Sequence, residues 1–121
     1  MRGRPFIINQ DGSGKRFQSI EAKKGIYDEG WLQELLRKQP ELLPVADIES
    51  IFYPLIPIGR EVNTNSGAID NLFISPRGYL VLVETKLWKN PEGNREVLAQ
   101  AIDYGSSLSK WTYTKLHTAA R

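Results

Sequence analysis

The sequence of 121 residues has no cysteine, a single histidine and no long apolar run. Without cysteine, neither a disulfide framework nor a thiolate metal site can form. His117 has no second histidine with which to build a metal site. No apolar run approaches the ~20 residues that a membrane span needs, and the N-terminus lacks the apolar segment of a signal peptide. We therefore expect a soluble, cytoplasmic protein.

Basic residues gather at the N-terminus. Hydrophobic residues make up 40% and charged residues 25% of the chain, which are ordinary values for one globular domain. Residues 1–24 hold six Lys or Arg against two acidic residues, although the whole chain has a net charge of only +2. We expect residues 1–25 to form a basic arm or small hairpin and residues 26–121 to form the main domain. The arm suits contact with phosphates, and a solvated tail is the alternative reading.

Residues 68–87 predict two β-strands around a tight turn. Residues 68–75 alternate and are rich in β-formers, and residues 79–87 are an almost unbroken apolar run. Pro76 suits the first central position of a type I turn, and Gly78 suits the left-handed position that follows it. The pattern is typical of a three-residue hairpin loop that ends in a glycine bulge.

That loop would set the pairing of the two strands. Ser75 would face Tyr79, so Asp70 would lie directly opposite Glu84, and Lys86 would lie on the same face of its strand. Opposed side chains have Cβ atoms ~5 Å apart, where like charges are destabilising. A divalent metal with oxygen ligands would relieve that repulsion. A two-residue turn would instead place the two carboxylates on opposite faces.

One helix is expected before this hairpin in the sequence and another after it. Residues 27–39 predict a helix with Asp28 as N-cap, in which Glu29 falls on the buried side and Glu34 more toward solvent. By residue type alone, Glu29 is explained by first-turn electrostatics. A second helix is expected over residues 94–108, and it carries Gln100 and Tyr104 on one face.

The remaining segments are less regular. Residues 48–62 contain Pro54 and Pro57 and predict short extended pieces, the last being a strand over residues 56–63 that completes a three-stranded meander. Glu61 lies near the carboxylate pair by topology, but alternation does not fix its face. Residues 6–8 and 16–20 predict two short strands, with a flexible arm as the alternative. Residues 112–114 fit a strand, or Thr112 caps another helix.

Asp70, followed after thirteen residues by Glu84-Thr85-Lys86, resembles the D…(E)xK signature of the PD-(D/E)XK nuclease superfamily. The segment 66–70 fits the same signature, with Ile69 where proline often stands. Gln100 and Tyr104 resemble the QxxxY motif that follows this strand in RecB-type members. Residues 29–44 resemble the first helix of several of these families.

The resemblance implies an α/β (α+β) restriction endonuclease-like core of order αβββα(β), with a mixed β-sheet around a central antiparallel meander. It implies a nuclease that uses Mg²⁺ or Mn²⁺ to hydrolyse phosphodiester bonds, with DNA favoured over RNA. The implied metal ligands are Asp70, Glu84, the backbone carbonyl of Thr85 and, from the helix, Glu29, with Glu34 in reserve. Lys86 would orient water, and Gln100 and Tyr104 would position the substrate strand.

Two alternatives come from other functional classes. One is a nucleic-acid-binding module of the same fold that does not cleave. The other is an accessory domain that forms a homodimer through aromatic residues such as Trp31, Trp88 and Trp111. The abrupt end of the chain also suggests a fragment of a longer protein.

Overall fold

The computed structural model describes residues 3–20, 25–86 and 93–120, without the side chains of residues 93–98. Its fold is α+β, with a three-stranded antiparallel sheet, a separate two-stranded hairpin and four α-helices in the described residues. Two single-turn 3-10 helices, at Pro40–Leu42 and Ser50–Phe52, complete it. The elements in chain order are β1 (Phe6–Ile8), β2 (Gly14–Arg16), α1 (Glu29–Lys38), α2 (Val45–Ile48), β3 (Ile56–Thr64), β4 (Gly67–Ile74), β5 (Leu80–Val83), α3 (Gly93–Leu108) and α4 (Tyr113–Ala119).

The turn between β4 and β5 has the predicted geometry. Gly78 has φ +85°. Its N–H donates to the carbonyl of Ser75 at 2.9 Å, and the Ser75 N–H donates to the carbonyl of Tyr79 at 2.8 Å. The ladder pairs Ile74 with Leu80 and continues in step to Asn71 and Val83. The predicted register is therefore confirmed, although β5 ends at Val83 and residue 87, the expected end, lies outside the described residues.

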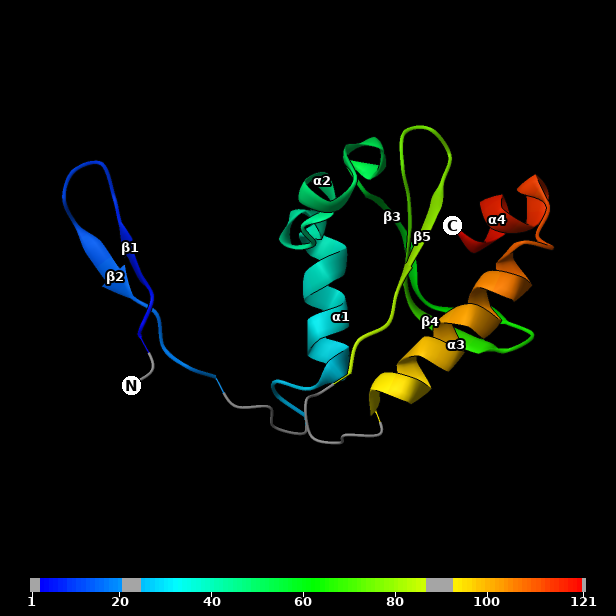
Figure 1. Cartoon of the computed structure of the whole chain (residues 1–121), viewed down its shortest axis with the longest axis horizontal. Helices are drawn as coiled ribbons and strands as arrows, with labels where there is room; N and C mark the ends of the chain where they lie inside the picture. Colours follow the sequence, from blue (N-terminus) through cyan, green and yellow to red (C-terminus); the bar gives the residue numbers. More distant parts are fainter. Residues whose placement is uncertain (1–2, 21–24, 87–92, 121) are drawn as a thin grey trace.

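Helices cover both faces of the β3–β4–β5 sheet (Figure 1). Phe73 is fully buried in one cluster with Leu36 of α1. Its neighbour Leu72, also fully buried, packs in a second cluster with Tyr104 and Leu108 of α3. Successive residues of a strand point to opposite faces, so β4 contributes to both clusters. The result is three layers: α1 and α2, the sheet, then α3 and α4.

The caps of the helices explain where they begin. The Asp28 carboxylate accepts from the N–H of Trp31 at 2.9 Å, so the predicted N-cap of α1 is confirmed. The predicted strand over residues 56–63 is confirmed as β3, but the extended pieces expected from residue 48 onward are wrong for Ile48 and residues 50–52, which lie in short helical turns. The N–H of Ile48 bonds back to the carbonyl of Pro44 at 3.2 Å, which closes the first of these turns locally.

The C-terminal segment is helical. Thr112 Oγ1 accepts from the N–H of Lys115 at 3.2 Å and caps α4. The helical reading of this segment is confirmed and the strand reading is wrong. In the described residues the sheet is wholly antiparallel rather than mixed, and the final strand of an αβββα(β) core is replaced by α4. The order helix, three-stranded meander, helix agrees with the expectation.

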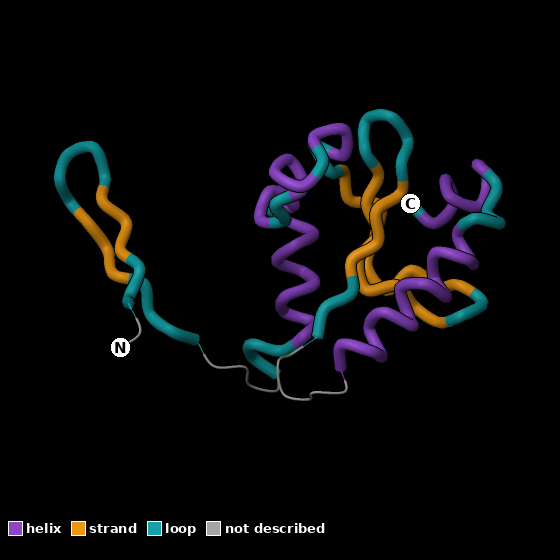
Figure 2. The backbone as a smooth tube through the Cα atoms, in the orientation of Figure 1, coloured by secondary structure: helices purple, strands orange, loops and turns teal. Residues whose placement is uncertain are grey.

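The N-terminal segment forms a hairpin, and Figure 2 shows it apart from the three-stranded sheet. Phe6 pairs with Arg16 and Ile8 with Gly14, so β2 begins earlier than predicted and ends at Arg16. All six strand residues are exposed. The division of the chain at residue 25 stays a prediction. No helix in the described residues has the length and hydrophobicity that crossing a membrane requires.

Replacing Gly78 with alanine should destabilise the protein by roughly 1–2 kcal/mol, because an L-residue is strained in the left-handed conformation. A Cβ at this position would meet nothing within 4 Å, so the backbone alone would cause the loss. Gly3→Ala is the matched control, since Gly3 also has open space but no positive φ. Urea unfolding of both variants measures the difference, and equal stability of the two would contradict the turn geometry.

Candidate functional site

Asp70 and Glu84 lie at the point where the β4–β5 ladder ends. The N–H of Asp70 donates to Glu84 Oε1 at 3.3 Å. In return, Asp70 Oδ2 accepts from the N–H of Thr85 at 2.9 Å and from Thr85 Oγ1 at 3.2 Å. These side-chain bonds continue the pairing beyond Asn71 and Val83, so the structure brings the two predicted carboxylates together.

The electrostatics of this pair favour a bound cation or proton. Burial, together with the charges of Asp70 and Glu61, raises the pKa of Glu84 to about 7, although the N–H of Asp70 opposes the shift. No Lys or Arg in the part of the chain that the structure describes forms an ion pair with either carboxylate. A side-chain hydrogen bond between the two carboxyl groups also contributes to the raised pKa of Glu84, so the pair can share one proton.

Glu61 is a third carboxylate at this level of the sheet. Arg60 pairs with Asn71 and Val62 with Ile69, so Glu61 stands opposite Asp70 on the next strand. Glu61 has φ +49°, which is strained for a residue with a side chain. Alternation along β3 could not assign its face. Counting the register outward from the two-residue turn after Thr64 would have found its position.

On both β3 and β4, side chains no longer alternate regularly between the two faces of the sheet near Glu61 and Asp70. Ile69 and Leu72, three residues apart on β4, pack in the same cluster. On β3, a Cβ built on Gly59 would lie 3.3 Å from Val62 Cγ2, so these residues also share a face. In a regular strand, residues three apart point to opposite faces. Asp70 and Glu61 therefore occupy an irregular part of the sheet, as functional residues often do.

Tyr104 of α3 lies close to the carboxylates. Burial, then the charges of Glu84, Asp70 and Glu61, raise the pKa of its hydroxyl. A Cβ on Gly67 would lie 3.2 Å from the Tyr104 hydroxyl, so glycine at the start of β4 permits this close approach. Gln100, one turn earlier on α3, is exposed. The structure thus brings Tyr104, but not Gln100, into packing against the sheet.

Lys86 lies beyond the end of β5 and is exposed. The strand predicted to continue through Lys86 ends at Val83, so Glu84 and Lys86 both lie beyond the regular ladder, and a shared face for their side chains stays a prediction. Thr85 between them is buried, at 6% exposure, and is tied to Asp70. A part for its carbonyl in metal binding stays a prediction.

The two helical carboxylates differ in their surroundings. Glu34 bonds to Arg37 at 2.5 Å and to Arg60 at 3.0 Å, and these guanidinium groups lower its pKa to about 2. Glu34 therefore links α1 to β3, and its carboxylate oxygens are engaged by guanidinium groups rather than open to a metal ion. Glu29, half-buried at the first turn of α1, is the better helical candidate.

A polar lock between α1 and the sheet lies directly beside the carboxylates. It consists of Gln33, Glu34, Arg60 and Asn71. Arg60 Nη2 donates to Gln33 Oε1 at 3.1 Å, and Asn71 Nδ2 donates to the backbone carbonyl of Gln33 at 3.0 Å. Gln33 and Asn71 are buried at 5% and 1% exposure. Arg60 directly precedes Glu61 on β3, and Asn71 directly follows Asp70 on β4. This lock therefore positions α1 against both site strands.

Two of the three tryptophans expected at a dimer interface, Trp31 and Trp111, have contacts with neighbouring side chains. Trp31 is 39% exposed and packs edge-on against Tyr27 at 5.0 Å. Trp111 packs beside the α3 cluster with Lys115 Nζ 5.2 Å from its ring centre. Trp88 lies outside the described residues. A homodimer through these residues stays a prediction.

The donor set fits a hard divalent cation that keeps much of its water. No group of three or more His, Cys, Asp or Glu side chains in the described residues is arranged to hold a metal ion. Mg²⁺ is commonly bound through one or two carboxylates, with water and substrate phosphates completing its shell. The Asp70–Glu84 pair meets that smaller requirement.

Comparisons with protein-family models, curated proteins and solved structures found no match. The resemblance to the nuclease superfamily thus rests on the motif residues themselves. In the structure, Asp70, Glu84 and Tyr104 lie close together although they are far apart in the sequence, and this agrees with the resemblance.

The raised pKa of Glu84 predicts a pH dependence of stability. The folded protein holds this proton more tightly than the unfolded chain, where the pKa is near 4.5. The contribution of Glu84 to stability is therefore full below pH 4.5 and declines as the pH rises to about 7. In EDTA, Glu84→Gln should gain stability relative to the wild type between pH 5 and pH 8.

Urea unfolding at about pH 5 and about pH 8 tests this, because the two values bracket the shifted pKa. Glu41→Gln, at an exposed carboxylate, is the control and should follow the wild type at both pH values. Parallel behaviour of Glu84→Gln and the wild type would contradict the prediction.

Proposed function

We propose that this protein is a metal-dependent nuclease that hydrolyses phosphodiester bonds, with DNA as the favoured substrate. The observation that supports it most is the pairing of Asp70 and Glu84 without a protein cation among the described residues. The D…(E)xK pattern of Asp70, Glu84 and Lys86 agrees with this activity.

In this proposal Asp70, Glu84 and the backbone carbonyl of Thr85 hold Mg²⁺ or Mn²⁺. Such an ion supplies an activated water and neutralises charge on the phosphate. Thr85 orients the Asp70 carboxylate through its two hydrogen bonds to Oδ2. Glu29 binds a second ion or its water ligands.

The remaining residues act on the substrate. Lys86, exposed at the end of the hairpin, orients the attacking water or stabilises charge that develops on the phosphate. Tyr104 and Gln100 position the strand that is cut. The buried hydroxyl of Tyr104 beside three carboxylates is suited to donate a hydrogen bond, because those charges disfavour its ionisation.

Cleavage assays test the proposal. Supercoiled plasmid, linear duplex and single-stranded DNA are incubated with the protein in Mg²⁺, Mn²⁺ or EDTA. We expect cleavage only with metal, and a loss of at least roughly 100-fold in Asp70→Asn, Glu84→Gln and Lys86→Met, since each removes a charge at the reacting phosphate.

Glu41→Gln serves as the surface control and should keep full activity. Circular dichroism establishes that each variant is folded. Metal-independent cleavage, or full activity in Asp70→Asn, would contradict the proposal. DNA binding without cleavage by the folded wild type would favour the non-cleaving module.

Metal binding can be tested without an activity assay, and the test shows which of the two carboxylates on α1, Glu29 or Glu34, contributes to it. Saturating Mg²⁺ or Mn²⁺ should raise the thermal midpoint of the wild type, because about 100 times Kd of ligand stabilises a protein by about 2.7 kcal/mol. Asp70→Asn should lose this response and Glu29→Gln should weaken it. Glu34→Gln should keep it despite a lower starting stability, since Glu34 is engaged by Arg37 and Arg60.

The comparison of Glu29→Gln with Glu34→Gln is matched, because both variants remove one carboxylate charge from α1. An equal metal response in the two variants would show that α1 supplies no ligand through Glu29. Loss of the response only in Glu34→Gln would transfer the role to Glu34.

A further inference from the structure

The β1–β2 hairpin carries cationic and apolar side chains on both of its faces. Phe6 stands opposite Arg16 on one face, and Ile7 stands opposite Lys15 on the other. The N–H of Phe17 donates to the carbonyl of Pro5 at 3.0 Å, which extends the pairing by one step. Phe6, Ile8 and Phe17 are 52%, 73% and 50% exposed. Such a surface is suited to contact with another molecule.

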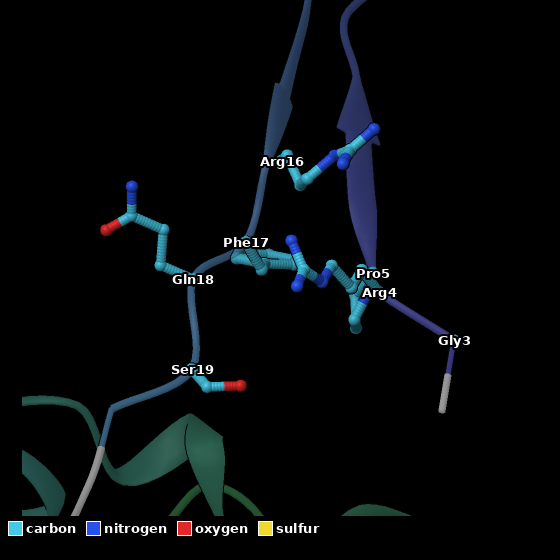
Figure 3. Close-up of a pocket in the computed structure, with 7 residues that line it drawn as sticks. All are labelled: Gly3, Arg4, Pro5, Arg16, Phe17, Gln18 and Ser19. Carbon is cyan, nitrogen blue, oxygen red and sulfur yellow. The ribbon is translucent and has the colours of Figure 1, made fainter. Parts of the chain in front are cut away.

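A hollow of about 510 Å³ opens at the base of this hairpin. Its lining includes Arg4, Arg16, Phe17, Gln18 and Ser19. Figure 3 shows the Arg16 side chain reaching across toward β1, and the Arg4 side chain reaching back toward Phe17. The hollow therefore presents two guanidinium groups, an aromatic ring and further hydrogen-bond donors.

Among the described residues, none that lines this hollow is acidic. Asp11, the one acidic residue in the segment 3–20, lies in the turn of the hairpin and accepts from both the N–H and the hydroxyl of Ser13. Within residues 3–20 and the other described ranges, no carboxylate at the hollow compensates the charge of Arg4 and Arg16, and an anionic partner is the complementary occupant.

Two other hollows, beside α4, differ in this respect. One is lined by Lys115 together with Glu61, and the other by Lys110 together with Asp103. Each combines charges of both signs. Of these three hollows, the one at the hairpin has a lining whose charge favours an anion most clearly.

We propose that the β1–β2 hairpin is a nucleic-acid docking element, in which Arg4 and Arg16 bind phosphates and Phe17 stacks on an unpaired base. Guanidinium groups bind phosphate oxygens in a bidentate manner. Aromatic side chains beside such cations are the usual platform for single-stranded nucleic acid. The choice of nucleic acid among anionic partners rests on the proposed function, but the docking needs no metal and no cleavage.

Binding of the full chain to a fluorescein-labelled 20-nucleotide single-stranded DNA, followed by anisotropy in EDTA over a range of NaCl concentrations, tests this proposal. Arg16→Gln should weaken binding by about 5-fold or more and lower the salt slope by about 1, since one phosphate contact is lost. Arg77→Gln removes the same charge at an exposed site in the β4–β5 turn and should stay within about 2-fold of the wild type.

Phe17→Leu isolates the stacking contribution. It should weaken binding of single-stranded DNA by roughly 5-fold or more, because stacking on an aromatic contributes about 1–3 kcal/mol per base. Binding of a blunt 20-base-pair duplex should fall less, since its bases are already stacked. Equal effects on both forms, or no effect on either, would overturn the stacking role.

Other occupants give distinct results. Binding to phosphatidylserine vesicles but not to the oligonucleotide would overturn the proposal in favour of a membrane surface. A dimer that Phe17→Leu disperses, with no DNA binding, would overturn it in favour of a second copy of the chain. Affinity unchanged in both Arg16→Gln and Phe17→Leu would also overturn it.

The outcome is separable from that of the proposed function. Glu41→Gln should bind the oligonucleotide as the wild type does, because this exposed carboxylate belongs neither to the hairpin nor to the candidate site and binding is measured without metal. Cleavage by the wild type with wild-type affinity in Arg16→Gln would overturn the docking role alone. Hairpin-dependent binding with no cleavage in Mg²⁺ or Mn²⁺ would overturn the nuclease alone.

Discussion

The opposition of Asp70 and Glu84 is the constraint on which the arrangement of the site depends. Two carboxylates at the end of a hairpin repel each other, and burial makes the repulsion costlier. The protein lessens it by giving each carboxylate a backbone donor, the N–H of Thr85 for Asp70 and the N–H of Asp70 for Glu84. These bonds do not neutralise the charge, and burial, together with the charge of Asp70, raises the pKa of Glu84 to about 7. A cation bound at this position would neutralise the negative charge that the backbone donors leave uncompensated.

The surrounding structure keeps the pair in place from both sides of the sheet. On one side, Gln33 and Glu34 of α1 hold Arg60 and Asn71, which are paired on β3 and β4 immediately next to the site. On the other, Tyr104 of α3 is buried in the apolar cluster that includes Ile69 and Leu72. The apolar layers provide the stability, and the polar lock determines how α1 lies on the strands.

Much of this could be predicted because it depends on local chemistry. Pro76 and Gly78 determine the turn, the turn determines the register, and the register brings Asp70 to Glu84. Asp28 likewise marks the start of α1 through its side-chain oxygen. The places where prediction failed are those where the chain departs from regular periodicity. β5 ends early and leaves Lys86 outside the ladder, and the segment before β3 closes into helical turns.

The local sequence is enough to specify the hairpin, its register and the residue types at its end, since turn conformation and strand pairing follow from a few neighbouring residues. The face of Glu61 and the engagement of Glu34 depend on the tertiary structure. The turn after Thr64 sets Glu61 opposite Asp70, but Glu61 has a left-handed backbone that no alternation pattern reveals. Glu34 is occupied because Arg60, distant in sequence, reaches it across the α1–β3 contact. Both depend on contacts between separate elements, which local patterns do not encode.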